Sequence, residues 1–312
     1  MRAAILREYG QPPEPGEFDE PQPGEGQVVL DVLAAGMNPV DLAMTSGTFY
    51  AGSPPLPSVV GREGVGRTPD GQIVYFDSPV APYGSFAEQA LVNADSTIPL
   101  PAELDPKLAV AFGTAGLAAW LALEWRAQVE EGETVLVLGA SGVVGQIAVQ
   151  AAKLLGAARV VAAARSAAGL KHAQELGADA IVQIGQVDDL AKAFQEASGE
   201  GVDVVIDPVW GEPAAAALEA CRPHARHVQI GQSAGSHATI SSAAVRGKML
   251  AILGHTNFRA PQEIKRAAYQ RMVEHAARGE LTVEVEWMAL DQAAEAWSRQ
   301  RSSPHHKLVL VP

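Results

Sequence analysis

One glycine-rich stretch decides the fold of this chain, and it reads Val135-Leu136-Val137-Leu138-Gly139-Ala140-Ser141-Gly142-Val143-Val144-Gly145. The apolar run before Gly139 predicts a buried strand, and a helical pattern starts after Gly142. A strand, a glycine turn and a helix in this order can bind the pyrophosphate of a dinucleotide at the helix N-terminus. Because the spacing is G-x-x-G-x-x-G, an ordinary turn with packing glycines is the alternative. We predict cofactor binding by Ala140, Ser141, Gly142, Val143 and Val144.

Strands and helices alternate beyond this turn. An Ala-rich helical pattern at 106–125 precedes it, and the alternation predicts right-handed βαβ units on a parallel sheet. The strands are expected at 134–139, 159–164, 180–183, 202–207, 226–231 and 248–254. The helices are expected at 144–156, 167–177, 187–198, 212–221 and 239–245.

The first hundred residues have a different composition and predict a compact, mostly β unit. Residues 11–26 are rich in Pro, Gly and Glu and are expected to form a loop between two short strands, followed by a strand at 27–36. Short strands are expected at about 72–76 and 86–92. The C-terminal part predicts a helix at 261–279, a strand at 281–288, a helix at 291–301 and a strand at 307–311. The last strand has no βαβ partner left, so we expect it to return to the N-terminal unit.

Composition and charge restrict the class of protein. The chain has 312 residues and 47% hydrophobic residues, enough for about two folded domains. A net charge of -13 argues against nucleic acid as a partner. No apolar run approaches the ~20 residues of a membrane span, and the N-terminus lacks a signal-peptide pattern. The single cysteine, Cys221, excludes an intramolecular disulfide. We expect a cytoplasmic enzyme or small-molecule binder, without a nucleic-acid or membrane partner.

The end of the second parallel strand discriminates between nicotinamide cofactors. An NAD site normally carries Asp or Glu there, which accepts from the ribose 2′-hydroxyl. Here the strand is followed by Arg165 and Ser166, and Arg165 lies 20 residues after Gly145. A guanidinium at this place pairs with a 2′-phosphate, and Ser166 can add a hydroxyl donor. Lys171 is a weaker candidate one helical turn later. The sequence therefore predicts NADPH, with a solvated surface arginine as the alternative.

A series of segments in order along the chain carries a family resemblance. The segments are 34–41 (AAGMNPVD), 47–50 (GTFY), 57–66 (PSVVGREGVG), 84–88 (GSFAE), 139–145, 175–179 (ELGAD), 201–207 (GVDVVID) and 307–311 (KLVLV). Together they resemble the zinc-independent medium-chain dehydrogenases/reductases of the quinone oxidoreductase (zeta-crystallin-like) family. The resemblance implies an α/β fold: a GroES-like β domain from residues 1–105 and 258–312, and a Rossmann domain with a doubly wound parallel sheet from residues 106–257.

The resemblance also indicates whether the zinc ligands of related enzymes are present in this chain. Zinc-dependent relatives place a Cys in the segment matching Asn38 and a His where Arg62 stands before Glu63. Both ligands are missing here, so we expect no metal site. Without a Lewis acid, alcohol oxidation lacks stabilisation of the alkoxide, whereas electron-poor acceptors can still take a hydride.

The resemblance further implies roles for individual residues. Asn38 and Tyr50 are expected to be catalytic, together with Asp41. The alternatives are that Asn38 is a turn residue, that Tyr50 packs at the pocket rim, and that Asp41 ties the loop to Arg62. Glu63 is likewise expected to bind a backbone group. Trp210, which follows the fourth parallel strand on the cofactor side, is expected to form part of the pocket wall. The resemblance places the following near the cofactor: Thr114, Gly231, Gln232, Ser233 and the segment 255–257.

The sequence supports three functions. The first is an NADPH-dependent reductase of quinones, the second a reductase of conjugated C=C bonds in enones or alkenals, and the third a non-enzymatic, crystallin-like NADPH-binding protein. The apolar segment 248–254 is expected to be an edge strand that a second copy covers, which predicts a homodimer.

Overall fold

The computed structural model describes residues 1–101 and 103–312, which form two compact units. Unit 1 contains Met1–Thr114 and Val283–Pro312, and unit 2 contains Ala115–Thr282. The predicted domain boundary at 257/258 therefore differs from the division between the units. Residues 258–282 fall in unit 2, where the ring of His275 lies 5.5 Å from that of Trp120 and the amide of Thr282 donates to Gln150.

The sheet of unit 2 is fully parallel and has the order β11-β10-β9-β12-β13-β14. Its strands are β9 (Thr134–Leu138), β10 (Arg159–Ala164), β11 (Ala180–Gln183), β12 (Val202–Asp207), β13 (Cys221–Gln229) and β14 (Ala251–Gly254). Apolar side chains of these strands are buried on both faces of the sheet, as the uninterrupted apolar runs predict. The order turns back at β9, so its carboxyl end is the switch point at which such sheets bind ligands.

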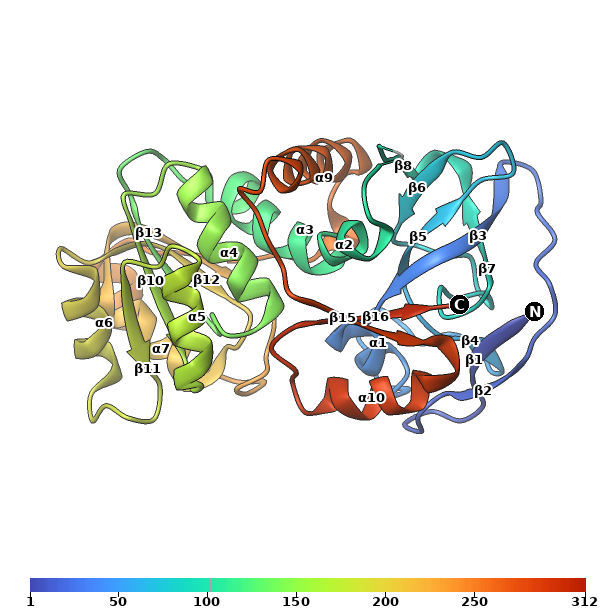
Figure 1. Ribbon diagram of the computed structural model, residues 1–312. Coiled ribbons are helices and arrows are strands. Elements are labelled where there is room, and N and C mark those ends of the chain that lie inside the picture. Colours follow the sequence, from blue (N-terminus) through green and yellow to red (C-terminus); the bar gives the residue numbers. More distant parts are fainter. Residues whose placement is uncertain (102) are drawn as a thin grey trace. The chain divides into compact units, whose positions relative to one another are not determined.

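Helices cover both faces of this sheet. Helices α4 and α5 pack on one face, and α6 and α7 pack on each other over the opposite face (Figure 1). The helices are α3 (Thr114–Leu121, whose first residue belongs to unit 1), the π-helical η2 (Ala122–Ala127), α4 (Val143–Leu154), α5 (Ala167–Glu175), α6 (Leu190–Ser198), α7 (Gly211–Ala220), α8 (Ser242–Gly247), η3 (Asn257–Arg259) and α9 (Gln262–Ala277). This arrangement confirms the doubly wound, Rossmann-like α/β architecture.

Unit 1 is built on two sheets, and the larger of them joins both ends of the chain. One sheet has the order β2-β1-β4, and the other has the order β15-β16-β3-β5-β6-β8 with β7 also paired to β3. The strands are β1 (Arg2–Leu6), β2 (Glu14–Glu17), β3 (Gln27–Gly36), β4 (Ser58–Val59), β5 (Glu63–Arg67), β6 (Ile73–Phe76), β7 (Gln89–Asn93), β8 (Ile98–Pro99), β15 (Val285–Ala289) and β16 (Lys307–Val311). The short helices are α1 (Pro39–Met44), η1 (Ala94–Ser96), α2 (Pro106–Ala111), η4 (Leu290–Gln292) and α10 (Ala293–Arg301). The antiparallel pairing of β16 with β3 confirms that the last strand returns to the N-terminal unit.

The structure corrects several predicted elements. The expected loop at 11–26 contains β2, which pairs with β1; it accommodates Pro15 because it is an edge strand. The strand expected at 226–231 begins at Cys221, with an irregular register opposite Val202 and Val204. The strand expected at 248–254 is limited to β14, and the strand expected at 281–288 starts later and ends one residue later, as β15. The helical pattern at 106–125 is divided into three short helices.

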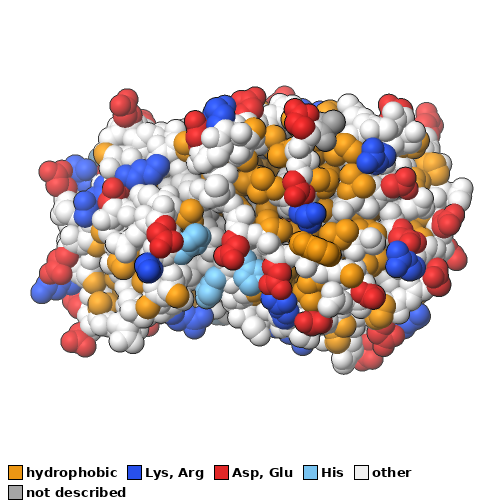
Figure 2. All heavy atoms as spheres, viewed as in Figure 1, with side chains coloured by type: hydrophobic (Ala, Val, Ile, Leu, Met, Phe, Trp, Pro, Cys, Tyr) orange, Lys and Arg blue, Asp and Glu red, His pale blue; other side chains and the backbone are white. Residues whose placement is uncertain are grey.

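The surface carries both signs of charge. Figure 2 shows acidic and basic side chains interspersed on the face drawn, without a continuous basic patch. None of the helices formed by the described residues has the length and apolar composition that a membrane span requires.

Candidate functional site

The turn between β9 and α4 is shaped by its own backbone. Gly139 has φ +64, and the carbonyl oxygen of Gly139 accepts from the amide of Gly142 at 3.0 Å. The amide of Ala140 donates to the carbonyl of Ala163 on the neighbouring strand at 3.0 Å. Gly142 caps α4 without a side chain, so the first amides of the helix, which have no partner inside it, point out of its N-terminus. Such amides are donors for a phosphate.

The three glycines of the turn have different reasons to be glycine. A Cβ at Gly145 would lie 2.4 Å from the carbonyl oxygen of Gly139, and a Cβ at Gly139 would lie 2.8 Å from Val209. These two glycines are required by packing. A Cβ at Gly142 would meet only the oxygen of Gly139, at 3.6 Å. Nothing in the fold requires Gly142, and the space beside its backbone fits close approach of a pyrophosphate.

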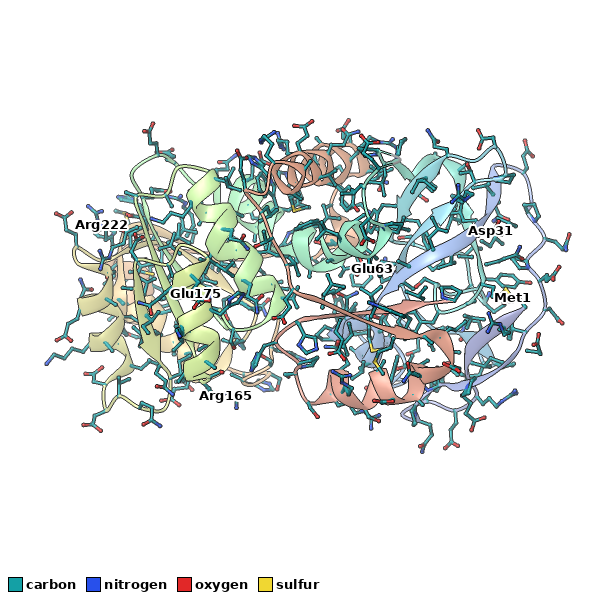
Figure 3. All side chains as sticks on the ribbon, in the orientation of Figure 1. Met1, Asp31, Glu63, Arg165, Glu175 and Arg222 are labelled. Atoms are coloured by element: carbon teal, nitrogen blue, oxygen red, sulfur yellow. The ribbon has the colours of Figure 1, made fainter. Side chains whose placement is uncertain are left out.

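The loop after β10 places the residues predicted to select the cofactor. Ser166 caps α5 through its hydroxyl, which accepts from the amide of Gly169 at 3.1 Å. A Cβ at Gly169 would lie 2.3 Å from that of Ser141, so the start of α5 packs directly on the phosphate turn. Arg165 and Lys171 are exposed. Figure 3 shows Arg165 and Glu175 at opposite ends of α5, with Arg165 at its start. Among the described residues, no side chain forms an ion pair with Arg165.

The loops after β12 and β13 contact each other at the same edge of the sheet. The amides of Ile230 and Gly231 donate to the carbonyl of Asp207 at 2.8 and 3.4 Å. A Cβ at Gly231 would lie 2.6 Å from the carbonyl oxygen of Pro208, so only glycine fits there. Gln232 and Ser233 are less closely packed and lie beyond this contact. The structure therefore brings these residues to the carboxyl edge that also carries the phosphate turn.

Two further groups in unit 2 are kept uncharged by burial. Burial lowers the pKa of His255 to about 4, although its Nε2 pairs with Asn257 at 3.1 Å. Burial raises the pKa of the Cys221 thiol to about 12, which makes this cysteine unreactive as a nucleophile.

In unit 1, Asn38 belongs to a buried polar network rather than to an open surface. Its Nδ2 donates to Glu63 Oε1 at 2.7 Å and to the carbonyl of Gly36 at 3.3 Å. Its Oδ1 accepts from Lys307 Nζ at 2.7 Å, and Lys307 also contacts Glu63 Oε1 at 2.7 Å. Asn38, Glu63 and Lys307 are at most 3% exposed. The amide of Asn38 is fully engaged within the chain, so its catalytic role stays a prediction that these contacts do not favour.

Glu63 is the centre of this network. Its Oε2 accepts from the hydroxyl of Tyr75 at 2.9 Å and from the backbone amide of Thr114 at 2.5 Å. The interpretation that Glu63 ties down a backbone is therefore confirmed. The amide of Thr114 is engaged by this carboxylate, and Thr114 itself is half-buried at the start of α3.

Asp41 and Tyr50 lie in different surroundings. Asp41 is buried in α1, and its Oδ2 accepts from the amide of Asn38 at 2.8 Å. Burial raises the pKa of Asp41 to about 7 despite this hydrogen bond. Asp41 is thus part of the capping box that starts α1, and the charge of Arg62 also acts on its pKa. The tie of Asp41 to Arg62 stays a prediction. Tyr50 is 77% exposed, and its ring lies 4.5 Å from that of Phe49.

A pocket of about 260 Å³ lies within unit 1 beside this network. Its walls are mostly apolar, with Val59, Val60, three prolines at 54, 55 and 82, and Tyr83. Arg62 and Asp41 contribute the charged side chains to its lining. Arg62 is half-buried and donates to the hydroxyl of Ser78 at 3.2 Å.

Sequence reasoning missed Lys307, Asp207 and His227 as members of polar clusters. Lys307 and Glu63 are 244 positions apart, and Asp207 and His227 lie on neighbouring strands. One signal was available: a lysine or histidine that opens or interrupts an otherwise apolar buried strand requires a partner.

Comparison with known proteins agrees with this geometry. Residues 143–275 match the family model described as zinc-binding dehydrogenase, a region that excludes Asn38 and Arg62. The chain is 34% identical over 220 residues to quinone oxidoreductase of Rattus norvegicus, covering 66% of each protein. The solved quinone oxidoreductase of Thermus thermophilus, described also in complex with NADPH, is 31% identical over all of both chains, with a TM-score of 0.84.

A third relative is much longer than this chain. A phenolphthiocerol/phthiocerol polyketide synthase polypeptide of Mycobacterium tuberculosis is 28% identical over 332 residues, which cover 99% of this chain. The chain spans only 15% of the length of that relative.

Proposed function

This chain belongs to the quinone oxidoreductase-like medium-chain dehydrogenases/reductases, and we propose that it transfers a hydride from NADPH to quinones without a metal ion. One observation carries the metal-free part of the proposal. The buried ammonium of Lys307 donates to Asn38 Oδ1 at 2.7 Å. Asn38 resembles the position at which zinc-dependent relatives carry a cysteine ligand. The Asn38 oxygen is thus occupied by an ammonium that Glu63 balances, and a side-chain amide is not among the usual ligands of zinc.

The phosphate turn and the loop after β10 support the choice of NADPH. When bound, the cofactor supplies the hydride. The first amides of α4 would bind its pyrophosphate, and Gly142 leaves room for it. Arg165 and Ser166 stand where a carboxylate would select NAD, and the guanidinium fits a 2′-phosphate. Ser141, Val143 and Val144 complete this part of the site, with Lys171 as a second cation.

The pocket of unit 1 supports an aromatic or conjugated acceptor. Its apolar walls suit a flat ring, and the Arg62 guanidinium in its lining can stabilise negative charge that develops on an acceptor oxygen. Tyr50 remains a candidate donor to the same oxygen. Quinones accept a hydride without a Lewis acid, so this class of acceptor fits a metal-free transfer.

A panel of acceptors tests this proposal. NADPH oxidation is followed with quinones, with conjugated enones and alkenals, and with aldehydes as the metal-requiring class, while cofactor fluorescence reports binding. We expect turnover with quinones that chelators leave unchanged. Faster turnover of enals would assign C=C reduction instead, and binding without any turnover would assign a non-enzymatic role. Loss of activity with a zinc-selective chelator and its return with zinc would refute the metal-free site.

We also propose a homodimer. Strand β14 lies at the edge of the parallel sheet, where Ile252 and the preceding Met249 are exposed apolar side chains. Uncovered apolar edges favour pairing with a second copy. Light scattering is expected to give twice the chain mass of 32.6 kDa at micromolar concentration; a particle of one chain mass would contradict the dimer.

A further inference from the structure

The last residue of β12 is a buried carboxylate that the proposed function does not use. Asp207 is 0% exposed, and its carboxylate accepts three hydrogen bonds. Its Oδ1 accepts from the backbone amides of Val209 and Trp210 at 2.8 and 2.7 Å. Its Oδ2 lies 2.8 Å from Nε2 of His227, which is 1% exposed on β13. Because the partner is a carboxylate, Nε2 carries the proton. The pair links two neighbouring strands directly below their carboxyl ends.

This pair holds Trp210 in a conformation that tryptophan rarely adopts. Trp210 has φ +57 and ψ -157, and non-glycine residues persist in this region only when their surroundings impose it. The amide of Trp210 is held by Asp207, and its ring meets the ring of His227 edge-on, with centroids 5.9 Å apart. Asp207 and His227 together therefore determine where the tryptophan ring lies.

The same turn forms one wall of the phosphate site. Val209 Cγ1 lies 2.8 Å from the place of a Cβ at Gly139, so the turn after β12 packs on the glycine turn. The carbonyl of Val209 accepts from the amide of Ala234 at 2.7 Å, which connects the turn to the loop containing Gly231–Ser233. Displacement of Val209 and Trp210 would therefore move both loops at this edge.

The strand order shows which half of a dinucleotide meets this wall. The pyrophosphate lies at the end of β9, and Arg165 at the end of β10 faces the adenosine ribose phosphate in the proposed site. β10 and β12 flank β9 on opposite sides. The nicotinamide half must then extend towards β12 and β13, where Val209, Trp210 and Gly231 lie.

We propose that Asp207 and His227 are positioning residues that hold the Val209–Trp210 wall for the nicotinamide half of the cofactor. The inference rests on the proposed cofactor site. It assigns the two halves of the dinucleotide to different polar groups: Arg165 to the adenosine 2′-phosphate, and the Asp207–His227 pair to the nicotinamide nucleoside.

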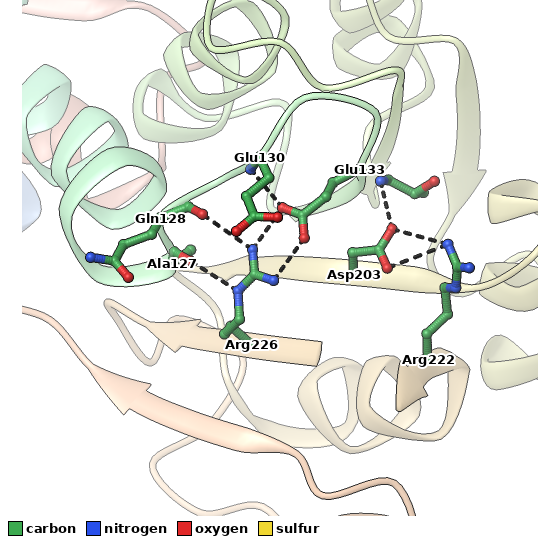
Figure 4. Close-up of polar contacts among 8 residues, drawn as sticks. Ala127, Gln128, Glu130, Glu133, Asp203, Arg222 and Arg226 are labelled. Atoms are coloured by element: carbon green, nitrogen blue, oxygen red, sulfur yellow. Dashed lines mark hydrogen bonds and ion pairs between the residues drawn. The ribbon is translucent and has the colours of Figure 1, made fainter. Parts of the chain in front are cut away.

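The amino ends of the strands in the same sheet, far from the proposed site, offer a residue for a matched control. Asp203 also lies on β12, accepts from the amide of Thr134 at 2.8 Å and pairs with Arg222 at 3.5 Å. Figure 4 shows this pair beside that of Arg226 with Glu133, whose atoms approach to 2.6 Å. Figure 3 shows Arg222 and Arg165 at opposite edges of the sheet. Asp203 is thus a bonded carboxylate on the same strand but at the far end from the site.

The test measures the binding of two ligands by calorimetry: NADPH, and adenosine 2′,5′-bisphosphate, which lacks the nicotinamide mononucleotide half. His227→Gln and Asp207→Asn are expected to weaken NADPH binding about tenfold each, as expected when a buried hydrogen bond is broken. Binding of the bisphosphate is expected to stay within about twofold in both variants. Asp203→Asn should leave the affinities for both ligands unchanged, and Arg165→Ala should weaken both.

Four results would overturn the inference. Unchanged NADPH affinity in both His227→Gln and Asp207→Asn would remove the positioning role. An equal loss for both ligands would show a general structural defect. Where Asp207→Asn fails to fold, the decision rests on His227→Gln, which retains a side-chain amide donor. If the unaltered protein bound the bisphosphate and NADPH equally, the nicotinamide half would make no contact. If it bound neither, the proposed cofactor itself would be wrong, and this inference with it.

Discussion

The buried network of unit 1 and the phosphate turn of unit 2 use polar groups in opposite ways. In unit 1, Asn38 and Glu63 have their donors and acceptors engaged by Lys307, Tyr75 and the backbone. In unit 2, the helix that starts after Gly142 has no side-chain cap, and space remains beside that glycine. We call a network saturated when its hydrogen-bonding groups have partners within the chain, and such a network holds its own residues in place. An unsaturated turn, whose backbone amides lack such partners, can bind a ligand. The difference separates residues that stabilise the structure from residues that are available to bind a ligand.

The largest effect is expected where the saturated network loses its charge balance. Lys307→Met leaves the Glu63 carboxylate buried without a counter-ion, and breaking one partner of a buried ion pair costs about 3–5 kcal/mol. The free energy of unfolding, measured with urea, should fall by that amount.

Two matched variants sharpen this prediction. Lys192→Met removes an exposed lysine that pairs with Glu196 at 3.8 Å, and it should cost less than about 1 kcal/mol. Adding Glu63→Gln to Lys307→Met should recover part of the loss because the buried charge is gone. A loss no larger than that of Lys192→Met would mean that the network is not maintained in solution.

The next effect concerns two buried groups whose pKa values shift in opposite directions, one in each unit. For Asp41, the pKa of about 7 in the folded protein lies above the ordinary 3.8, so the folded state binds more protons between these values. Asp41 therefore lowers stability as pH rises from about 4 to about 7. For His255, the folded pKa of about 4 lies below 6.5, and its contribution to stability rises with pH over that interval.

Variants of the two groups should separate these opposing slopes. Relative to the unaltered protein, Asp41→Asn should make stability rise more steeply between about pH 4.5 and 7, by on the order of 3 kcal/mol across the window. His255→Gln should make it rise less steeply, or fall. Urea unfolding at several pH values provides the measurement. Equal slopes in all three proteins would show that burial does not shift these pKa values.

A third prediction tests the unsaturated turn. Gly142 has φ -84, which alanine adopts easily, and its Cβ would have room. Gly142→Ala should therefore change the free energy of unfolding by at most about 1 kcal/mol. The methyl group would collide with a bound pyrophosphate, and NADPH should bind about thirtyfold more weakly, or about 2 kcal/mol.

Gly145→Ala is the comparison for this variant. Its Cβ would lie 2.4 Å from the oxygen of Gly139, so we expect a loss of stability as well as of binding. Unchanged NADPH affinity in Gly142→Ala would exclude the turn as the phosphate site.

The same contrast explains what the sequence could predict. The strands at 159–164, 180–183, 202–207 and 307–311 were predicted at the bounds of β10, β11, β12 and β16. Strands β10, β12 and β16 are largely apolar runs buried by their neighbours, so a local pattern identifies them. Strand β11 lies at the sheet edge with Ile181 40% exposed, and the alternation of strands and helices identifies it. The glycine turn was predictable for the same reason, since strand, turn and helix are contiguous.

Contacts between distant segments could not be predicted in this way. The pairing of Lys307 with Glu63, and of His227 with Asp207, depends on which strands become neighbours in the sheets. The edge strand β2 was missed because Pro15 and Gly16 carry no strand pattern, and its pairing with β1 decides its structure. Asn38 was expected to face a ligand because sequence alone does not show that Lys307 occupies its oxygen.

The smallest predicted effect tests the selectivity of the site in unit 2. Arg165 is exposed, and it follows a strand that ends without a carboxylate. The unaltered protein should bind NADPH at least about tenfold more tightly than NADH, a difference of about 1.4 kcal/mol. Arg165→Asp should remove most of this gap, because its carboxylate repels a 2′-phosphate and can accept from a 2′-hydroxyl. Lys171→Asp, one helical turn later, should reduce the gap by less.

Fluorescence titration of the two reduced cofactors measures these affinities at one salt concentration, since exposed charges are screened by ions. Equal affinities for NADPH and NADH in the unaltered protein would refute the assignment of Arg165 and leave the turn as a site for either cofactor.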